Sequence, residues 1–186
     1  MILWHLGVTA AVIFLTLGRR GIDYRMVMFG ALLPDLIDKP IGRVFFADQF
    51  ENGRIFAHTL LFSTVLLLGI QLFLRGRTAR RWFIVPIAAV IHQVLDGMWN
   101  EPVTFFWPLF TTRFPRDPVG DYWLRVLMRP LEEPIVLLQE VIGLALLLYI
   151  ASAYRLWERD RRTQFIRTGY LTERPVRTRP KETDAS

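Results

Sequence analysis

Two polar side chains stand one helical turn apart in an otherwise apolar segment. If residues 82–99 form a helix, His92 and Asp96 share one face of it. Imidazole nitrogens and carboxylate oxygens are good ligands for a closed-shell divalent metal such as zinc. Polar atoms in an apolar helix are costly, and membrane helices keep them for function. The pair is therefore a candidate half of a metal site, although such pairs also arise by chance.

More histidines and aspartates stand at the ends of other apolar runs. Asp35 and Asp38 can share a helix face at i, i+3 spacing, while His5 and His58 lie near the ends of two further runs. Catalytic zinc sites commonly have three protein ligands and a water. We expect four residues to hold the metal: Asp35, His58, His92 and Asp96. We expect His5 and Asp38 to be second-tier ligands or acid–base groups.

The chemistry that such a site favours is hydrolysis. A divalent metal lowers the pKa of a bound water from ~15.7 to about 7, which makes a nucleophile available at neutral pH. An ester or a phosphoester is the natural substrate. Arg54 stands one turn before His58, where it can offset negative charge on the substrate.

The composition is that of a membrane protein. Of the 186 residues, 52% are hydrophobic and 13% are aromatic, which is unusual for a soluble domain. There is no cysteine, so disulfides, thiolate zinc sites and a cysteine nucleophile are excluded. The pI is near 10.3, but the arginines lie in short blocks between apolar runs, as the positive-inside rule describes. We therefore expect membrane lipids as partners and no direct nucleic-acid binding.

Apolar runs of nearly membrane-spanning length set the expected fold. Four runs approach the ~20 residues that cross a bilayer, namely residues 1–17, 56–74, 82–99 and 134–154. Residues 26–38 form a shorter run in which Pro34 removes one helical hydrogen bond. We expect an all-α, polytopic integral membrane bundle of four to five transmembrane segments over residues 1–154. A basic, flexible cytoplasmic tail is expected over residues 155–186.

The basic blocks also predict an orientation. The densest blocks, residues 75–81 and 155–162, fall on the same side of the expected bundle, which is the cytoplasmic side by the positive-inside rule. The N-terminus and all the candidate ligands then lie at the outer face. Residues 99–110 are expected to lie on the membrane interface, followed by a short amphipathic helix over residues 121–131 that ends at Pro130.

Four blocks carry the candidate residues: His5; Gly30-Ala-Leu-Leu-Pro34-Asp35-Leu-Ile-Asp38; Arg54-Ile-Phe-Ala-His58-Thr59; and His92-Gln-Val-Leu-Asp96. Together with Thr104-Phe-Phe-Trp-Pro108-Leu-Phe110, they resemble the YdjM-like family over residues 1–154. Its members are LexA-binding, inner-membrane-associated proteins described as metal-dependent hydrolases. The order of ligands is also similar to the first part of the zinc-dependent phospholipase C pattern. The ligands that would complete the three-metal cluster of that enzyme are not apparent, so one metal, or two at most, is expected.

The resemblance and the residues together predict a multi-pass hydrolase in the inner membrane of a prokaryote. It would act on a lipid-borne or membrane-accessible ester, with a phosphoester favoured, and would use zinc before manganese or magnesium. A first alternative is a non-enzymatic protein that moves protons or metal ions, with Glu140 inside the last span as part of the path. A second alternative is a membrane-anchored interaction protein whose arginine-rich tail docks a cytoplasmic partner.

Overall fold

The computed structural model describes residues 1–18, 21–118 and 122–171, and these are all-α, as predicted. The helices are α1 (Ile2–Thr16), α2 (Tyr24–Pro40), the π-helix η1 (Ile41–Phe45), α3 (Ala47–Phe50), α4 (Leu60–Phe73), α5 (Gly76–Trp82), α6 (Ile84–Leu95), the 3-10 helix η2 (Met98–Asn100), α7 (Pro102–Phe105), α8 (Tyr122–Glu132), α9 (Pro134–Ala153) and α10 (Arg159–Thr168). Residues 172–186, which make up nearly half of the predicted tail, lie outside the described part, as do residues 19–20 and 119–121.

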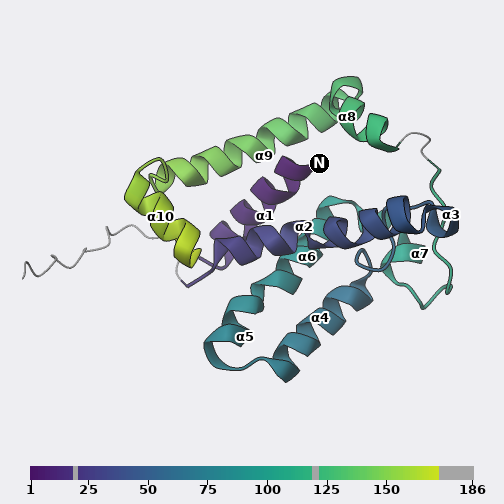
Figure 1. The fold of residues 1–186 in the computed structure, drawn as a ribbon, viewed down its shortest axis with the longest axis horizontal. Coiled ribbons are helices and arrows are strands. Elements are labelled where there is room, and N and C mark those ends of the chain that lie inside the picture. Colours follow the sequence, from purple (N-terminus) through teal and green to yellow (C-terminus); the bar gives the residue numbers. More distant parts are fainter. Residues whose placement is uncertain (19–20, 119–121, 172–186) are drawn as a thin grey trace, which may run out of the picture.

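Four helices form the centre of the molecule. Helix α1 packs between α9 and α2, α2 packs on α6, and α6 in turn contacts α4 (Figure 1). Apolar side chains of α1, α2, α6 and α9 are buried between them, among them Ile13, Val27, Ala88 and Ile150. This core fixes α2 and α6 side by side. These two helices carry Asp35 and His92, and Asp96 is the C-cap of α6.

Glycines allow two of these helix pairs to approach closely. A Cβ atom on Gly30 of α2 would lie 2.5 Å from the carbonyl oxygen of Val85 in α6. A Cβ atom on Gly7 of α1 would lie 2.1 Å from the carbonyl oxygen of Gly143 in α9. Real Cβ atoms do not come so close, so larger residues would push these helices apart. Gly30 of the motif therefore acts through helix packing and brings the Asp35 helix against the His92 helix.

The prediction of four to five full-length spans is not supported. Among the described residues, α9 is the one helix long and apolar enough to cross a membrane, with 20 residues and a mean hydropathy of 2.2. Helices α1 and α4 are apolar but have only 15 and 14 residues. At ~1.5 Å per residue such helices measure about 22 Å, short of the ~30 Å hydrocarbon core. Length therefore separates α9 from the other apolar helices.

The predicted helix over residues 82–99 is in fact interrupted at both ends. The chain changes from α5 to α6 at Phe83, and α6 ends at Leu95, before Asp96 and Gly97. Gly97 has a φ of 69°, the left-handed conformation that ends many helices. The predicted apolar run therefore contains a 12-residue helix, α6, rather than one spanning helix.

Two helices continue past an internal proline. Helix α2 continues through Pro34 to Pro40, because the loss of one backbone donor need not end a helix that is held by tertiary packing. Helix α8 likewise continues past Pro130 to Glu132 and does not end at the proline. The predicted first residue of that helix, Asp121, and the side chains of Trp123 and Leu127 lie outside the described part.

The first part of the expected tail packs back on the bundle. Asp23 caps the N-terminus of α2, and the Arg81 guanidinium lies 2.5 Å from its carboxylate. Arg25 donates hydrogen bonds to the carbonyl oxygens of Ile166 and Arg167 at the end of α10. Leu171 is buried in the core cluster. These contacts gather the basic segments around α5 and α10 at the start of α2, at the far end of that helix from Asp35.

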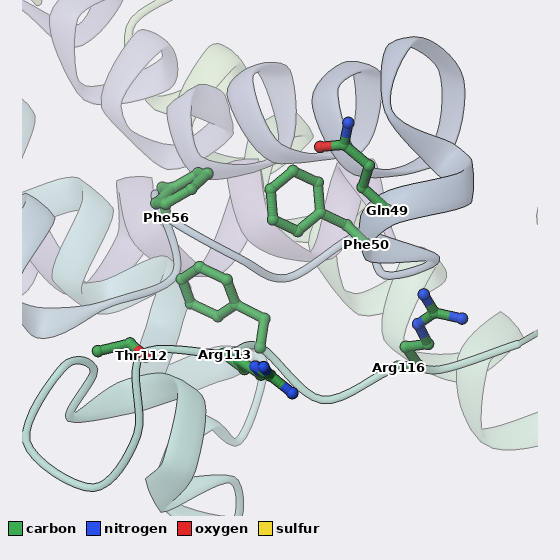
Figure 2. A pocket seen from close by; sticks show the side chains of 7 residues that line it. Gln49, Phe50, Phe56, Thr112, Arg113 and Arg116 are labelled. Atoms are coloured by element: carbon green, nitrogen blue, oxygen red, sulfur yellow. The ribbon is translucent and has the colours of Figure 1, made fainter.

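The segment after α7 crosses the loop that carries His58. Asn52 donates a hydrogen bond to the carbonyl oxygen of Pro115 at 2.7 Å, and Arg43 pairs with Asp117 at 2.8 Å. Between α3, Phe56 and residues 112–116 lies a pocket of about 570 Å³ (Figure 2). The pocket therefore opens beside the loop over residues 51–59, which connects α3 to α4.

Candidate metal centre

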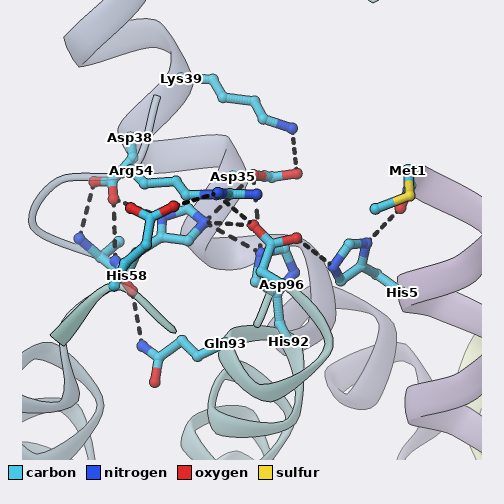
Figure 3. Close-up of polar contacts among 12 residues, drawn as sticks. Met1, His5, Asp35, Asp38, Lys39, Arg54, His58, His92, Gln93 and Asp96 are labelled. Carbon is cyan, nitrogen blue, oxygen red and sulfur yellow. Dashed lines mark hydrogen bonds and ion pairs between the residues drawn. The ribbon is translucent and has the colours of Figure 1, made fainter. Parts of the chain in front are cut away.

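The structure brings the four predicted metal ligands together. One ligand atom from each of Asp35, His58, His92 and Asp96 can be chosen so that all four lie within 4.8 Å of one another. Figure 3 shows the side chains converging from α2, from the loop before α4 and from the end of α6. Residues 61 positions apart in the chain thus form one cluster, and both histidines are fully buried.

His58 is positioned by Asp38. The Asp38 carboxylate lies 2.7 Å from Nδ1 of His58 and accepts backbone hydrogen bonds from Ile55, Ala57 and His58. Both side chains have no solvent-exposed surface. Because Nδ1 is held by a carboxylate, Nε2 is the nitrogen that faces the cluster. The structure thus gives Asp38 a positioning role, since its oxygens are occupied by four donors and do not reach solvent.

His92 is oriented in the same way by a backbone group. Its Nδ1 lies 2.7 Å from the carbonyl oxygen of Ala31, one turn before Asp35 in α2. Its Nε2 lies 3.3 Å from Nε2 of His58. A donated Nδ1 proton leaves the Nε2 lone pair directed toward the cluster. Both imidazoles therefore present the same nitrogen to a common point.

Asp96 keeps the predicted relation to His92 although it is the C-cap of α6. Its backbone N–H donates to the carbonyl oxygen of His92 at 2.9 Å, as in one more helical turn. One carboxylate oxygen lies 2.9 Å from Nε of Arg54 and 3.6 Å from Nε2 of His58. The other lies 3.0 Å from Nε2 of His5. Asp96 therefore contacts three groups at once: His58 of the cluster, Arg54, and His5 of α1.

Asp35 faces the two imidazoles from α2. Its Oδ1 lies 3.6 Å from Nε2 of His58 and 3.8 Å from Nε2 of His92. Its Oδ2 is bound by the ammonium group of Lys39, one turn further along the helix. Sequence reasoning missed Lys39, although the i, i+4 spacing of opposite charges was a usable signal. Lys39 leaves Oδ1 as the oxygen that Asp35 offers to the cluster.

His5 lies beside the cluster and not among its four members. Its Nδ1 contacts the carbonyl oxygen of Met1, and its ring centroid lies 4.1 Å from that of His92. Its Nε2 approaches Asp96 without the geometry of a hydrogen bond. The predicted position of His5 next to the ligands is thus observed, and the contact with Asp96 is consistent with a second-tier role.

Arg54 borders the cluster on its more open side. Its Nε donates to Asp96 and its Nη1 to Glu101 at 3.0 Å, while about a third of the side chain is exposed. Its backbone N–H donates to the side chain of Asn52. Among the described residues Nη2 of Arg54 makes no hydrogen bond. Nη2 of Arg54 is therefore available as a donor at the exposed edge of the cluster, next to Asp96.

Gln93 was also missed by sequence reasoning. It is fully buried, and its amide nitrogen donates to the carbonyl oxygens of Ala57 and Thr59 and to the Ser63 hydroxyl, all at 3.0 Å. A glutamine in an apolar helix is a signal for a buried hydrogen-bond network. Its function here is to tie α6 to the start of α4 and so hold the loop that carries His58.

The position of Glu140 inside an apolar helix is explained by its contacts with the N-terminus of α1, without a role in transport. Its carboxylate accepts a hydrogen bond from the backbone N–H of Leu3 at 2.9 Å, and it lies 3.8 Å from the N-terminal amine. The first backbone N–H groups of a helix lack partners within the helix, and an anion there is favourable. Glu140 thus satisfies the N-terminus of α1 and lies outside the four-residue cluster.

The charges of the cluster fit a bound cation. Burial lowers the pKa of His58, but the carboxylates of Asp35, Asp38 and Asp96 outweigh it and raise the pKa to about 10. A positive charge is therefore favoured at this position even though it is buried. Two imidazole nitrogens and two carboxylate oxygens match the ligands that zinc takes, whereas magnesium prefers oxygen alone. The donor set is thus compatible with a divalent metal ion.

One comparison with known proteins gives a match. The model of a family described as YdjM inner membrane protein matches residues 1–163, which include the whole cluster. No curated protein and no solved structure gives a significant match.

Proposed function

Because the chain belongs to the YdjM inner membrane protein family and buries a cluster of two histidines and two aspartates, we propose that it is a membrane-bound, metal-dependent hydrolase. The substrate would be a lipid-borne or membrane-accessible ester, with a phosphoester favoured. The observation that carries the proposal is the convergence of Asp35, His58, His92 and Asp96 within 4.8 Å.

These four residues would hold the metal, with zinc favoured and manganese or magnesium as alternatives. The metal would acidify a bound water and polarise the ester. The contacts of Asp38 with His58 and of the Ala31 carbonyl with His92 keep both Nε2 atoms available for binding. The same contacts would hold both imidazoles in one orientation during binding and reaction.

Arg54 would bind the substrate. Two of its nitrogens are occupied by Asp96 and Glu101, and this fixes the guanidinium at the exposed edge of the cluster. Its free Nη2 could then donate to an oxygen of a phosphoryl group, which carries negative charge in the ground state and during cleavage. A phosphoester is thus favoured over a neutral ester.

The membrane would be contacted through α9, which exposes apolar residues such as Ile135, Leu138, Val141 and Leu148. The basic segments around Asp23 lie at the other end of α2 from Asp35. By the positive-inside rule this supports a cytoplasmic basic end and a cluster at the outer face of the inner membrane. A substrate at the outer leaflet is the corresponding expectation.

Turnover of a panel of phosphodiesters, phosphomonoesters and carboxyl esters by zinc-loaded protein in detergent micelles tests the proposal. Asp96→Asn should lose at least about 100-fold in kcat/KM, as expected when a metal ligand or its charge is removed. Asp160→Asn, an exposed aspartate on α10, serves as the matched control and should keep full activity. Absence of turnover of the whole panel by zinc-loaded wild type would reject the proposal.

A further inference from the structure

The pocket beside the His58 loop combines aromatic rings with arginines. The rings of Phe50, Phe56 and Phe114 pack edge to face, with centroid distances of 4.9 to 6.2 Å, and Trp107 stacks on Phe114 at 5.3 Å. Arg113 and Arg116 come from the segment that crosses this aromatic floor (Figure 2). The pocket is thus lined both by aromatic rings and by two cationic side chains.

The two guanidinium groups are not neutralised. Within the described ranges, neither Arg113 nor Arg116 forms an ion pair with a carboxylate; Arg116 only donates to the backbone oxygen of Asp48 at 3.3 Å. The nearby carboxylate of Asp117 is already paired with Arg43. Unpaired arginines can bind phosphate oxygens in a bidentate manner, and they are less strongly hydrated than lysine. The pocket therefore has the charge to accept an anion.

Exposed apolar residues also stand within a few positions, along the chain, of residues that line the pocket. Phe45, before α3, and Leu109 and Phe110, after α7, are 74%, 80% and 66% exposed. Large exposed apolar side chains next to arginines are typical of a surface that meets lipid head groups and the first part of acyl chains. A small hydrophilic anion would leave these residues unused, whereas an amphiphile would contact both parts.

The pocket is physically joined to the cluster. Phe56 lines the pocket two residues before His58. Asn52 links the two sites, because it donates to the carbonyl oxygen of Pro115 and accepts from the backbone N–H of Arg54. A molecule held in the pocket would therefore lie next to the loop that carries both Arg54 and His58.

We propose that this pocket binds the phosphate-bearing head group of an anionic amphiphile, with Arg113 and Arg116 as the phosphate contacts and the three phenylalanines as the apolar floor. The inference rests on the proposed function in one respect, since it names the class of substrate that the cluster would receive. Binding to the pocket is measured without turnover, so the two proposals can fail separately.

The test measures binding by isothermal titration calorimetry on the full chain in a non-ionic detergent. The probes are short-chain phosphatidylglycerol, which is anionic, short-chain phosphatidylcholine, which is zwitterionic, and inorganic phosphate. The variant Arg113→Ala/Arg116→Ala removes both contacts. The variant Arg77→Ala/Arg80→Ala removes the same charge from exposed positions on α5 and is the matched control. His92→Ala tests whether binding depends on the cluster.

We expect wild type to bind phosphatidylglycerol more tightly than phosphatidylcholine. The Arg113→Ala/Arg116→Ala variant should bind it about 10-fold more weakly or worse, because two charged hydrogen-bond donors are lost. The control variant and His92→Ala should bind within about 2-fold of wild type. Arg113→Ala alone, whose side chain makes no hydrogen bond among the described residues, should show part of the loss.

Equal affinity of wild type and the Arg113→Ala/Arg116→Ala variant would overturn the proposal, and so would an equal loss in the control variant. Inorganic phosphate separates the possible sources of the anion. If phosphatidylglycerol binds and inorganic phosphate does not, the pocket recognises a lipid head group. If inorganic phosphate also binds, and this binding requires the two arginines, the pocket recognises the phosphate group itself. If wild type binds phosphatidylglycerol through the two arginines but hydrolyses no ester, the proposed hydrolase function is rejected and the proposed binding pocket is still supported.

Discussion

The Asp38 carboxylate holds His58 at two points, 3.0 Å from its backbone nitrogen and 2.7 Å from Nδ1 of its ring. His58 is the one member of the four-residue cluster that no helix carries or caps. A loop residue has more conformations to lose than a helical one, so its ring needs additional contacts to stay in place. Asp38 supplies these contacts from α2, the same helix that carries Asp35.

Replacing Asp38 by asparagine should weaken metal binding without removing a ligand. Asparagine keeps one oxygen that accepts hydrogen bonds, replaces the other by an NH2 group that can only donate, and carries no charge. Fewer of the four donors around Asp38 are then satisfied and the His58 ring is held less firmly, so we expect zinc affinity to fall by about 10- to 100-fold. Equilibrium dialysis with a zinc indicator measures this. Asp48→Asn, at an exposed position of α3, is the control. Unchanged affinity in Asp38→Asn would contradict the positioning role.

Purified protein should contain roughly stoichiometric zinc or manganese, as expected for a site with three or four protein ligands. His92→Ala and Asp96→Ala should each remove it, because each loses one member of the cluster. Elemental analysis gives the metal content, and far-UV circular dichroism checks that the helices remain. Full metal retention by both folded variants would eliminate the metal site.

Glu140→Gln should affect stability more than function. The amide can still accept the hydrogen bond of Leu3, but the negative charge at the N-terminus of α1 is lost. We expect a decrease of about 0.5–1 kcal/mol in the free energy of unfolding, with metal content and hydrolysis retained. Thermal unfolding in detergent and elemental analysis measure these quantities. Proton or metal flux into liposomes that requires Glu140, in a protein without hydrolytic activity, would favour the transport alternative.

The orientation in the membrane can be tested by cysteine labelling, since the chain has no native cysteine. Asp48→Cys lies in α3, which follows the Asp35 end of α2 in the chain, and Asp160→Cys lies in α10 at the basic end. An impermeant maleimide added to intact cells should label Asp48→Cys and spare Asp160→Cys. The reverse pattern would place the cluster at the cytoplasmic face and remove the expectation of an outer-leaflet substrate.

Acid should weaken the junction between α2 and α10 through Asp23. Burial tends to raise the pKa of Asp23, but the hydrogen bonds and charge of Arg25, with help from Arg81, hold this pKa below the ordinary value of 3.8. A carboxylate with a lowered folded-state pKa stabilises the fold above the unfolded-state pKa, and this contribution is lost as the pH falls through the folded-state pKa.

Wild type should therefore exceed Asp23→Asn in stability by a constant amount above about pH 5, and the difference should shrink below about pH 4. Denaturant unfolding followed by circular dichroism from pH 7 to pH 2 gives this difference. Asp160→Asn, exposed on the neighbouring helix, should show no such dependence. A difference that grows as the pH falls would contradict the assignment.

The sequence alone determined which residues could bind a metal and part of their arrangement. The helical period places His92 and Asp96 on one side, and the Asp96 N–H still bonds to His92 although α6 ends between them. The order of apolar runs and basic blocks also predicted that Asp35 and His58 would meet this pair. These inferences succeeded because they depend on short-range periodicity and on the large free-energy cost of leaving polar groups alone in an apolar environment.

Only the tertiary structure decided what the remaining polar groups do. Asp38 positions His58, and Glu140 serves the N-terminus of α1; each contact joins residues that are far apart in the chain. The prediction of four to five spans was likewise not supported, because the apolar content of a run does not reveal where its helix breaks, as at Phe83 and Gly97. Hydrogen-bond partners and helix ends depend on packing between distant segments, and no local pattern in the sequence encodes that packing.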